Sequence, residues 1–466
     1  MKVVVVGGGI SGLTAAFSLL KADPDADVTI LESTGRIGGV ISTLFDEDCV
    51  IEEGPDSFLT SKPWAVSLCE ELGLLDQLIA TNDANRRAFI ATDGRLQPLP
   101  EGFFLLAPTK IWPFIDSPIL SVRGKIAAAL ESLKAPIQSC EDETLKDFVV
   151  RRFGEELFER IAQPMVGGIY TGDPEKLSAA ATLPQFVEME QKYGSVTRGL
   201  LTHGRLNSKD SGARYSAFAS MNLGLQALVE NLGDKIGRDK IQLNSGLRTI
   251  STSAERWKLV TCSGQSQEAD VVVLAAPAQS VSGIISSLDS SLSANLASIE
   301  HASSAILNLL FDKNDITHPL DGFGFVVPER ERKSIIACSF SSTKFKGRAP
   351  ANKVLMRVFL GGALHPDVFA LSDGHLIKVA LEDLRTYLGI TSYPLKIWLK
   401  RWPNAMPQYH LGHLELVRQI KQRFLNHRGL IWAGSALTGV GIPDCVRAGF
   451  EAAQLVRVYQ RESVTD

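Results

Sequence analysis

The sequence has few cysteines, no long hydrophobic run and no marked excess of charge of either sign. Six cysteines are scattered through 466 residues without a short pair spacing, so neither a disulfide framework nor a cysteine-based metal site is indicated. We expect reduced thiols in the core of a cytoplasmic protein. The formal net charge of −4 lacks the basic excess that is typical of nucleic-acid binding.

Long apolar segments are missing too. No window approaches the ~18 to 20 apolar residues that a membrane span needs. The opening MKVVVVGGG contains only four consecutive valines and shows no secretory signal. The most apolar stretch, EGFFLLAPTKIWPFI at 101–115, is interrupted by prolines and a lysine. It has two interpretations, the wall of a substrate channel and a patch that touches a membrane peripherally.

Strand and helix patterns along the chain predict an α/β fold. KVVVVGGGISGLTAAFSLLKA followed by DVTILES predicts a βαβ unit with a parallel sheet. A mainly helical region follows over about 63–200, and strand patterns return from 240 to 278 and from 303 to 362. A helix pattern at 373–389 and further strand and helix patterns lead to the end. This order predicts domains that are threaded through one another, and the polar segment 202–216 predicts a surface loop.

A glycine motif follows the first strand directly. Gly7, Gly9 and Gly12 match G-x-G-x-x-G and open a helix, where glycines permit a tight turn and the helix N-terminus attracts a pyrophosphate. Glu32 stands at the end of the next strand, 20 residues after Gly12, where a carboxylate can bind the ribose hydroxyls of an adenosine. Strand, spacing and acid together predict a dinucleotide site, for either FAD or NAD.

The segment after Glu32 favours FAD. STGRIGG places Arg36 and the pair Gly38–Gly39 just beyond the acid, and it resembles the second signature of the flavin amine oxidase superfamily. That resemblance implies that Arg36 contacts phosphate, for which a planar multi-donor cation is suited; an exposed arginine in a glycine loop is the alternative. EEGPDSF at 52–58 adds another sharp turn.

A second glycine-rich stretch lies near the end, GSALTGVGIPDCVRAGFEAA at 434–453. It reads as a glycine loop before a helix that Pro443 can begin. In flavin oxidases of the kind it resembles, this helix points its positive end at the flavin ring and stabilises the reduced anion. Asp444 is then either a helix cap or a residue at the cofactor, and the neighbouring Cys445 is expected to be a bystander. His410 and His413 have helical spacing but no further ligands, so no metal site is predicted.

GPDSF, GGIYTGDPEKLS, GFGFVVP, MPQYHLGH and GVGIPDC together resemble the protoporphyrinogen oxidase family, over essentially the whole chain. The similarity is greatest to the bacterial branch of Gram-positive organisms, whose members act on coproporphyrinogen III. The resemblance implies a p-hydroxybenzoate-hydroxylase-type FAD-binding domain with an interleaved substrate domain and an α-helical domain. The expected boundaries are 1–85, 217–285 and 400–466 for the FAD domain, 86–108 and 286–399 for the substrate domain, and 109–216 for the helical domain.

The resemblance also implies the chemistry. FAD would remove six electrons from a porphyrinogen in three rounds of hydride transfer from a meso carbon to flavin N5, and oxygen would reoxidise the flavin to give three hydrogen peroxide. No nucleophile or catalytic acid–base residue is predicted, since positioning the electron-rich macrocycle against the flavin is the main requirement.

Two groups of candidate site residues follow. The expected FAD-binding residues are Gly7, Gly8, Gly9, Ile10, Ser11, Gly12, Glu32, Ser33, Arg36, Gly38, Gly39, Val40, Gly54, Pro55, Asp56, Ser57, Leu247, Trp402, Gly434, Val440, Gly441 and Ile442. The expected substrate contacts are Lys62 for a propionate and Gly324, Val326 and Phe359 around the macrocycle. Trp402 is alternatively a core tryptophan, Lys62 a solvated lysine, and the three strand residues plain core.

Other functions stay open on the same sequence. Protoporphyrinogen IX is the alternative substrate, and the oligomeric state cannot be read. An amine or amino-acid oxidase commonly has an aromatic near the last glycine motif, where SALTGVGIPD has none. A flavin-binding protein without turnover is the third alternative.

Overall fold

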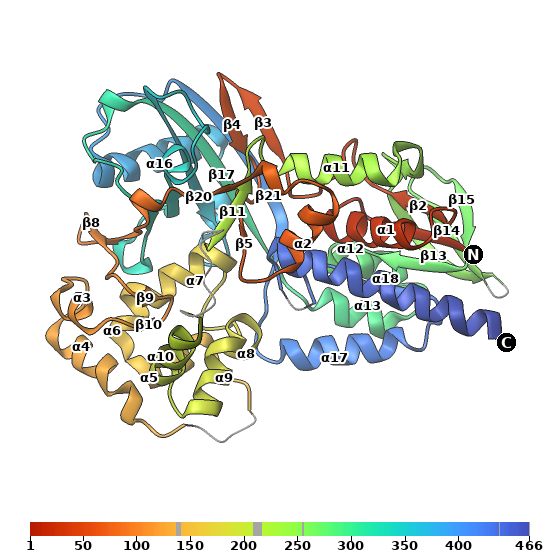
Figure 1. Cartoon of the computed structure of the whole chain (residues 1–466), viewed down its shortest axis with the longest axis horizontal. Coiled ribbons are helices and arrows are strands. Elements are labelled where there is room, and N and C mark those ends of the chain that lie inside the picture. The colour runs from red at the N-terminus through yellow and green to blue at the C-terminus, as the bar shows by residue number, and fades with distance from the viewer. Residues whose placement is uncertain (137–140, 208–216, 254–255, 438, 466) are drawn as a thin grey trace.

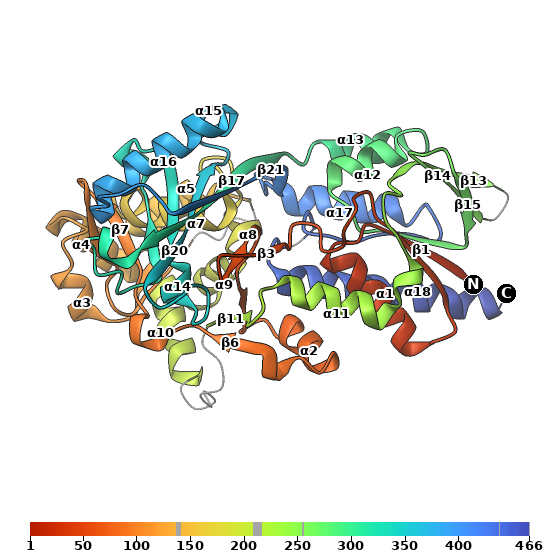
Figure 2. The same ribbon diagram turned by 90° about the horizontal axis from the view of Figure 1, so that it is seen from above.

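The structure of the protein is a computed structural model, which describes residues 1–136, 141–207, 217–253, 256–437 and 439–465. Figures 1 and 2 show an elongated molecule in which both chain ends lie at the same end. We call the part around the chain ends the terminal lobe and the remainder the second lobe.

The terminal lobe is built on a five-stranded parallel sheet. Its order is β12-β2-β1-β16-β22, with bounds Ile241–Gln242, Asp27–Leu31, Lys2–Val6, Val271–Leu274 and Leu430–Trp432. The valine run of β1 is buried on both faces, as parallel strands covered by helices require. Successive strand side chains point to opposite faces, so Val3 and Val5 join one core and Val4 and Val6 another.

Each core is closed by different elements. The Val3 side is covered by α1 (Ile10–Ala22), α2 (Trp64–Glu71), α11 (Gln226–Ile236) and α18 (Ile442–Thr465). The Val4 side is covered by α12 (Ala278–Ile285), α13 (Ser290–Ala297), α17 (His413–Phe424) and the antiparallel strands β13 (Leu247–Ser253), β14 (Arg256–Thr261) and β15 (Ser266–Ala269). Figure 2 shows the two groups on opposite sides of β1.

The second lobe contains a seven-stranded mixed sheet. Its order is β21-β17-β20-β19-β18-β7-β8, with bounds Lys396–Pro407, His301–Asp312, Lys353–Gly361, Ile335–Ser339, Gly324–Val326, Phe89–Thr92 and Arg95–Pro98. The helices α14 (Ser341–Lys344), α15 (Pro366–Ala370) and α16 (Asp373–Leu388) lie in the same part of the chain, and α16 packs into the core of this sheet. The strand patterns predicted over 303–362 are therefore confirmed, and β21 is a strand expected after the helix pattern 373–389.

Chain segments from distant positions share both sheets. The strands β16 and β22 pair although about 155 residues separate them, and β7 pairs with β18 across a larger interval. The predicted threading of the chain is confirmed by this pairing, while the individual domain boundaries stay predictions. Three small sheets complete the strands: β5 (Phe58–Leu59), β11 (Phe218–Met221) and β6 (Leu78–Ala80); β3 (Thr43–Asp46) and β4 (Cys49–Glu52); and β9 (Phe103–Phe104) and β10 (Ala107–Pro108).

A helical region packs below the mixed sheet in Figure 1. Its helices are α3 (Ile111–Asp116), α4 (Val122–Ala129), α5 (Leu145–Phe153), α6 (Glu155–Leu157), α7 (Gln163–Tyr170), α8 (Ala179–Thr182), α9 (Pro184–Tyr193) and α10 (Val196–Asn207). The predicted loop 202–216 is wrong for its first part, because α10 continues to Asn207. The helix begins at a buried Val196 and packs with Leu200, and this packing outweighs the polar composition. Residues 208–216 lie outside the described residues.

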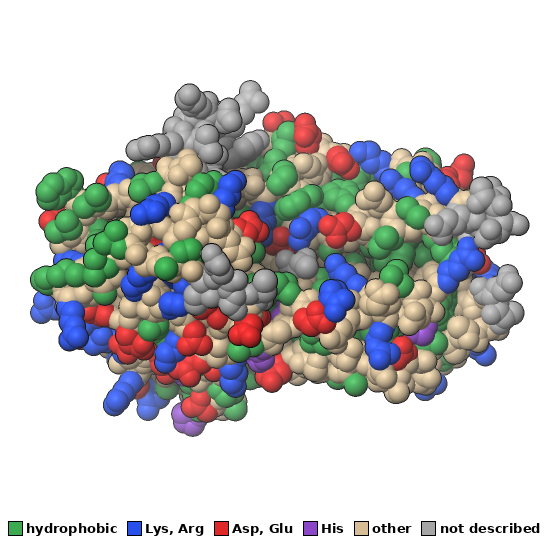
Figure 3. Space-filling model, turned by 90° about the horizontal axis from the view of Figure 1, so that it is seen from below, with side chains coloured by type: hydrophobic (Ala, Val, Ile, Leu, Met, Phe, Trp, Pro, Cys, Tyr) green, Lys and Arg blue, Asp and Glu red, His purple; other side chains and the backbone are tan. Residues whose placement is uncertain are grey.

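The apolar stretch 101–115 is divided between core and surface. Leu106 and Phe114 are buried, whereas Ile111 and Trp112 are about three-quarters exposed. Exposed apolar side chains of the following turns extend this surface: Val122, Ile126, Leu130 and Leu133. Figure 3 shows hydrophobic side chains gathered at this end of the molecule. The two interpretations, the wall of a substrate channel and peripheral membrane contact, stay predictions. Among the described residues, no helix has the length and apolar character needed to span a membrane.

The described cysteines are all free thiols. Cys49, Cys69, Cys338 and Cys445 are buried as expected, but Cys262 is exposed, since it follows the end of β14 in a turn. The predicted core position is therefore wrong for Cys262, and Cys140 lies outside the described residues.

Candidate functional site

The first glycine loop connects β1 to α1, and its glycines have different tasks. A Cβ on Gly7, whose φ is +113°, would lie 2.3 Å from the carbonyl oxygen of Ala275, and one on Gly12 would lie 2.0 Å from that of Gly7. These two glycines permit the close packing of the strand, the turn and the helix. A Cβ on Gly9 would meet no protein atom within 4 Å. Gly9 therefore faces open space at the start of α1, as a pyrophosphate cradle requires.

Glu32 follows β2 and points back at this loop. Its Oε2 accepts the Gly8 N–H at 2.7 Å, and its Oε1 accepts the Thr34 N–H at 2.8 Å. The side chain is buried, and the contacts fix the carboxylate beside the glycine loop. The predicted partner of the ribose hydroxyls thus lies next to the predicted pyrophosphate site. Ser33, also predicted to bind the cofactor, adds a hydroxyl contact of 3.3 Å to Oε1.

The segment 36–41 lies over the first loop. The Gly38 N–H donates to the Gly8 carbonyl at 2.8 Å, which joins the two glycine segments. The guanidinium of Arg36 donates to the carbonyls of Ile37 at 3.1 Å and Ile41 at 2.9 Å, and it also bonds the Gly39 carbonyl. Arg36 thus orders the loop with its terminal nitrogens, a use that its spacing did not predict. Phosphate contact by Arg36 stays a prediction.

The turn Gly54–Ser57 packs directly on that segment. A Cβ on Gly54 would lie 1.7 Å from the Val40 carbonyl oxygen, so only glycine allows this contact. Asp56 forms ion pairs with Lys344 at 3.0 Å and Arg357 at 3.2 Å. Burial alone would raise the pKa of Asp56, but the two cations hold it well below its usual range. Asp56 is a predicted cofactor-binding residue. In the structure its carboxylate is ion-paired with Lys344 and Arg357.

The second glycine loop lies beside the first because their helices pack together. A Cβ on Gly449 in α18 would lie 2.5 Å from the Ser11 carbonyl oxygen in α1, which requires close contact of the two backbones. Figure 1 shows α1 and α18 adjacent. Burial raises the pKa of the Cys445 thiol to about 12, so this thiol stays protonated and unreactive at neutral pH, in agreement with the predicted bystander role.

Two aromatic side chains anchor the backbone of the second loop. The Tyr409 hydroxyl donates to the Ser435 carbonyl, and the His413 Nε2 lies 3.2 Å from the Leu437 carbonyl oxygen. Their rings stack with centroids 4.2 Å apart. The motif MPQYHLGH pointed to this region, but no role for either side chain could be read from it. Among the predicted FAD-binding residues, Gly434 directly precedes this anchored segment, Val440 and Gly441 follow it, and Ile442 begins α18.

Lys62 reaches the start of α18 from the opposite end of the sequence. Its Nζ lies 2.6 Å from the Asp444 Oδ2, across 382 positions of sequence. Asp444 is almost fully buried, whereas the Lys62 side chain is 42% exposed. Lys62 is therefore not a solvated lysine without a partner. Part of its side chain nevertheless remains exposed to solvent beside the ion pair.

Leu247 and Trp402 lie near the segments that surround the first glycine loop. The backbone before Leu247 runs along the residues after β2, since the Ser245 N–H donates to the Glu32 carbonyl at 2.7 Å. The indole of Trp402 donates to the Glu53 carbonyl at 2.6 Å, next to the turn that packs on Val40. Trp402 is half-buried, so the core alternative is not favoured, and its contact with the flavin stays a prediction.

The predicted substrate residues of the mixed sheet share one face. Ala337 pairs with Val326 on one side and with Phe359 on the other, and directly paired residues point to the same face. Arg357, two residues before Phe359, is on this face too and lies 5.0 Å from its ring. Since Arg357 also bonds the Gly54 carbonyl, this face is turned toward the turn Gly54–Ser57.

Gly324 has a backbone reason to be glycine. Its φ is +143°, and a Cβ would lie 2.1 Å from the Cys338 carbonyl oxygen in the neighbouring strand. Val326 faces the helical region, because a Cβ on Gly168 would lie 3.5 Å from it. The end of α7, where Tyr170 lies, is therefore close to the candidate substrate face, and the substrate contacts themselves stay predictions.

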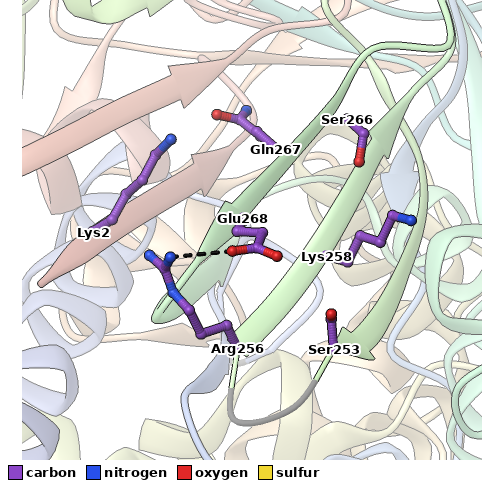
Figure 4. A pocket seen from close by; sticks show the side chains of 7 residues that line it. All are labelled: Lys2, Ser253, Arg256, Lys258, Ser266, Gln267 and Glu268. Carbon is purple, nitrogen blue, oxygen red and sulfur yellow. Dashed lines mark hydrogen bonds and ion pairs between the residues drawn. The ribbon is translucent and has the colours of Figure 1, made fainter.

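A separate pocket lies far from these residues. It is formed by β1 and the strands β13–β15 and is lined by Lys2, Ser253, Arg256, Lys258, Ser266, Gln267 and Glu268. Figure 4 shows Arg256 and Glu268 directed at each other in an ion pair, while Lys2 and Lys258 point away from it. None of the glycine segments contributes to it, so it is not the cofactor site.

Comparison with known proteins identifies the family of the chain. Residues 10–457 match the family model described as flavin containing amine oxidoreductase. The chain belongs to this family. It is an enzyme that binds FAD, and its mixed α/β fold is that of the flavin amine oxidases.

This flavin oxidoreductase has relatives that match over nearly its full length. It is 32% identical to the coproporphyrinogen III oxidase of Bacillus subtilis (strain 168), and 98% of each chain is covered. It is 30% identical to protoporphyrinogen oxidase 1, chloroplastic, of Arabidopsis thaliana, with 97% of this chain and 87% of the relative covered. The crystal structure of a candidate protoporphyrinogen oxidase from Exiguobacterium sp. 255-15 superposes with a TM-score of 0.87 at 32% identity, covering 99% of both chains. A reduced UDP-galactopyranose mutase has a TM-score of 0.73 at 15% identity over 98% of this chain and 95% of its own, which shows the fold alone.

The residues of this flavin oxidoreductase fit FAD. The open space at Gly9 and the unpaired start of α1 accept a pyrophosphate, and Glu32 is fixed beside them. Among the described residues, no group of three or more potential ligands could hold a metal ion.

Gly9→Ala should separate cofactor binding from folding. Since the new methyl group meets no protein atom and Gly9 has a φ of −73°, the melting temperature without FAD should stay unchanged. The methyl group would occupy cradle space, so the FAD dissociation constant should rise by about tenfold or more. Titration of the apoprotein by flavin fluorescence measures it. Gly283→Ala in α12, also in open space, is the matched control and should bind FAD normally. Unchanged affinity in Gly9→Ala would remove Gly9 from the cradle.

Proposed function

We propose that this enzyme oxidises coproporphyrinogen III to coproporphyrin III with bound FAD and molecular oxygen, in haem biosynthesis in the cytoplasm. The observation that carries the proposal is the full-length similarity to coproporphyrinogen III oxidases of Bacillus subtilis and Staphylococcus aureus, at 32% and 31% identity over 98% of each chain. The overall change is one porphyrinogen and three O₂ to one porphyrin and three H₂O₂, which balances six hydrogens and six electrons.

In this proposal, the residues of the chain bind FAD and orient the porphyrinogen against it. Bound FAD supplies the hydride acceptor. The first glycine loop and Glu32 hold the dinucleotide end, and the second loop, anchored by Tyr409 and His413, presents its backbone and the start of α18. The face with Val326 and Phe359 offers an apolar wall for the macrocycle, and Lys62 offers an ammonium for a propionate.

The ionisable groups near the second loop suit a reaction without a protein acid or base. Burial raises the pKa of Tyr170 and of Tyr409, and the Asp444 carboxylate adds to both rises. Burial lowers the pKa of His413 to about 4. These three groups therefore stay neutral at pH 7. This supports a site in which orientation against the cofactor dominates.

Anaerobic mixing tests the proposal directly. Coproporphyrinogen III should bleach the flavin absorbance band, and admission of oxygen should restore it and yield red porphyrin fluorescence. The FAD-loaded protein with no bleaching by either coproporphyrinogen III or protoporphyrinogen IX would refute the proposal. Bleaching by putrescine instead would point to an amine oxidase.

Protoporphyrinogen IX is the second candidate substrate. It is favoured by the similarity to the Arabidopsis protein and by the Exiguobacterium structure. Values of kcat/KM for the two porphyrinogens, measured side by side, decide between them. We expect the higher value for coproporphyrinogen III.

A further inference from the structure

The contact between Lys62 and Asp444 brings together two residues for which the sequence predicts separate roles. Lys62 is a candidate for a substrate carboxylate, and Asp444 belongs to α18, the helix expected to point at the flavin. Their 2.6 Å ion pair brings the two side chains together where the start of α18 meets the segment after β5. This pairing was not evident from either motif.

The Asp444 side chain is held firmly by its surroundings. A Cβ on Gly439 would lie 2.4 Å from the Asp444 Cγ, and one on Gly441 would lie 3.2 Å from its Oδ2. The glycine loop is therefore folded against the carboxylate, and any larger residue at these positions would displace it. Arg447 lies 3.7 Å from the other carboxylate oxygen and stacks on the Trp64 ring at 4.9 Å.

Lys62 is held less completely. An ammonium group has three N–H donors, and Asp444 accepts one of them. With 42% of its side chain exposed, Lys62 can present its other donors to an incoming carboxylate without leaving Asp444. A lysine between two carboxylates attracts both and offsets the Asp444 charge, whereas without it the buried carboxylate would repel an anionic substrate.

The pair also lies near the candidate substrate face. Burial and the Asp444 charge both raise the pKa of Tyr170 at the end of α7, and Gly168, two residues earlier, approaches Val326. The end of α7 thus lies between the ion pair and the face that carries Val326 and Phe359. An ammonium at this place is suited to a carboxylate on the rim of a flat apolar ligand.

We propose that Asp444 is a positioning residue that fixes the Lys62 ammonium for a carboxylate of the substrate and so contributes to selection of porphyrinogens by their acidic side chains. The inference rests on the proposed function. Asp444 acts through Lys62 and does not itself contact the substrate. The ion pair keeps the lysine in one place and keeps the buried carboxylate from repelling the ligand.

Binding of the porphyrin product tests this without turnover. The FAD-loaded protein is titrated with coproporphyrin III and with its tetramethyl ester in the same detergent, by quenching of flavin fluorescence. Asp444→Asn should weaken binding of the acid by about tenfold and binding of the ester less than about twofold. Lys62→Met should weaken acid binding more strongly, and Lys62→Arg should restore most of it.

The double variant gives the decisive comparison. In the Lys62→Met background the Asp444 carboxylate has lost this cation, so adding Asp444→Asn should improve acid binding. A merely structural role of Asp444 would instead weaken acid and ester equally, and the losses would add; either result overturns the inference. Lys378→Met, which breaks an exposed ion pair with Glu382 in α16, is the matched control and should behave like wild type.

Turnover separates this inference from the proposed function. With coproporphyrinogen III, Asp444→Asn should raise KM more than it lowers kcat. If the wild type binds the tetra-acid with the predicted dependence on Asp444 but oxidises no porphyrinogen, the proposed function fails and the positioning role stands. If it oxidises coproporphyrinogen III and Asp444→Asn leaves KM unchanged, the positioning role fails alone.

Discussion

Arg152→Met should destabilise the protein by about 3–5 kcal/mol, because it leaves a buried carboxylate without its cation. Arg152 and Glu131 are both fully buried, and the Arg152 Nε donates to Glu131 at 2.9 Å. Glu131 also accepts the Ser195 hydroxyl at 2.7 Å and the Val196 N–H at 3.0 Å. The pair therefore ties α5 to the start of α10.

Urea unfolding of the purified protein measures the loss. The variant Arg152→Met/Glu131→Leu should recover a large part of it, since no isolated charge remains buried. Lys378→Met removes an exposed ion pair and should cost less than about 0.5 kcal/mol. A loss below about 1 kcal/mol in Arg152→Met would contradict the expected cost of burying Glu131 alone.

Stability should also fall as the pH is lowered from about 6.5 to 4, in part because of His413. Burial lowers the pKa of His413 from 6.5 to about 4 in the folded protein. In this interval the unfolded chain binds a proton that the folded chain does not, so acid favours unfolding. The loss of unfolding free energy that His413 causes is nearly complete at pH 4 and amounts to about 3 kcal/mol.

The comparison of His413→Gln with wild type isolates this contribution. The variant is expected to lose some stability at pH 7, because the stack on Tyr409 is lost, and to lose less than wild type between pH 7 and pH 4. Denaturant midpoints at several pH values give the two slopes. His375→Gln, on the exposed start of α16, should keep the wild-type slope. Equal slopes in His413→Gln and wild type would show that His413 does not titrate as expected.

Local patterns were enough to predict the elements that are expected to hold the cofactor. The valine run, the glycine spacing and Glu32 at the end of the next strand predicted a strand, a turn and a helix, and the structure has all three in place. Such patterns succeed because each depends on backbone geometry within a few residues. The repeated pattern near Gly434 predicted a second loop and helix for the same reason.

Side-chain partners were not predictable in the same way. The bonds of the Arg36 terminal nitrogens to carbonyls of its own loop could not be read from its spacing, and its phosphate contact stays a prediction. Polar composition predicted a loop from residue 202, yet α10 continues to Asn207 because Val196 and Leu200 pack in the core and Ser195 and Glu131 fix the helix start. In both cases a nearby acceptor or a packed neighbour decided the outcome.

The sequence by itself thus determined the family, the FAD cofactor and the two glycine loops, because these depend on short spacings and on motifs. Only the tertiary structure decided that the loops lie side by side through α1 and α18, that Val326 and Phe359 share a face, and that Lys62 pairs with Asp444. These contacts join positions up to 382 residues apart. They arise from the way the chain is threaded between two sheets, and no local spacing encodes that path.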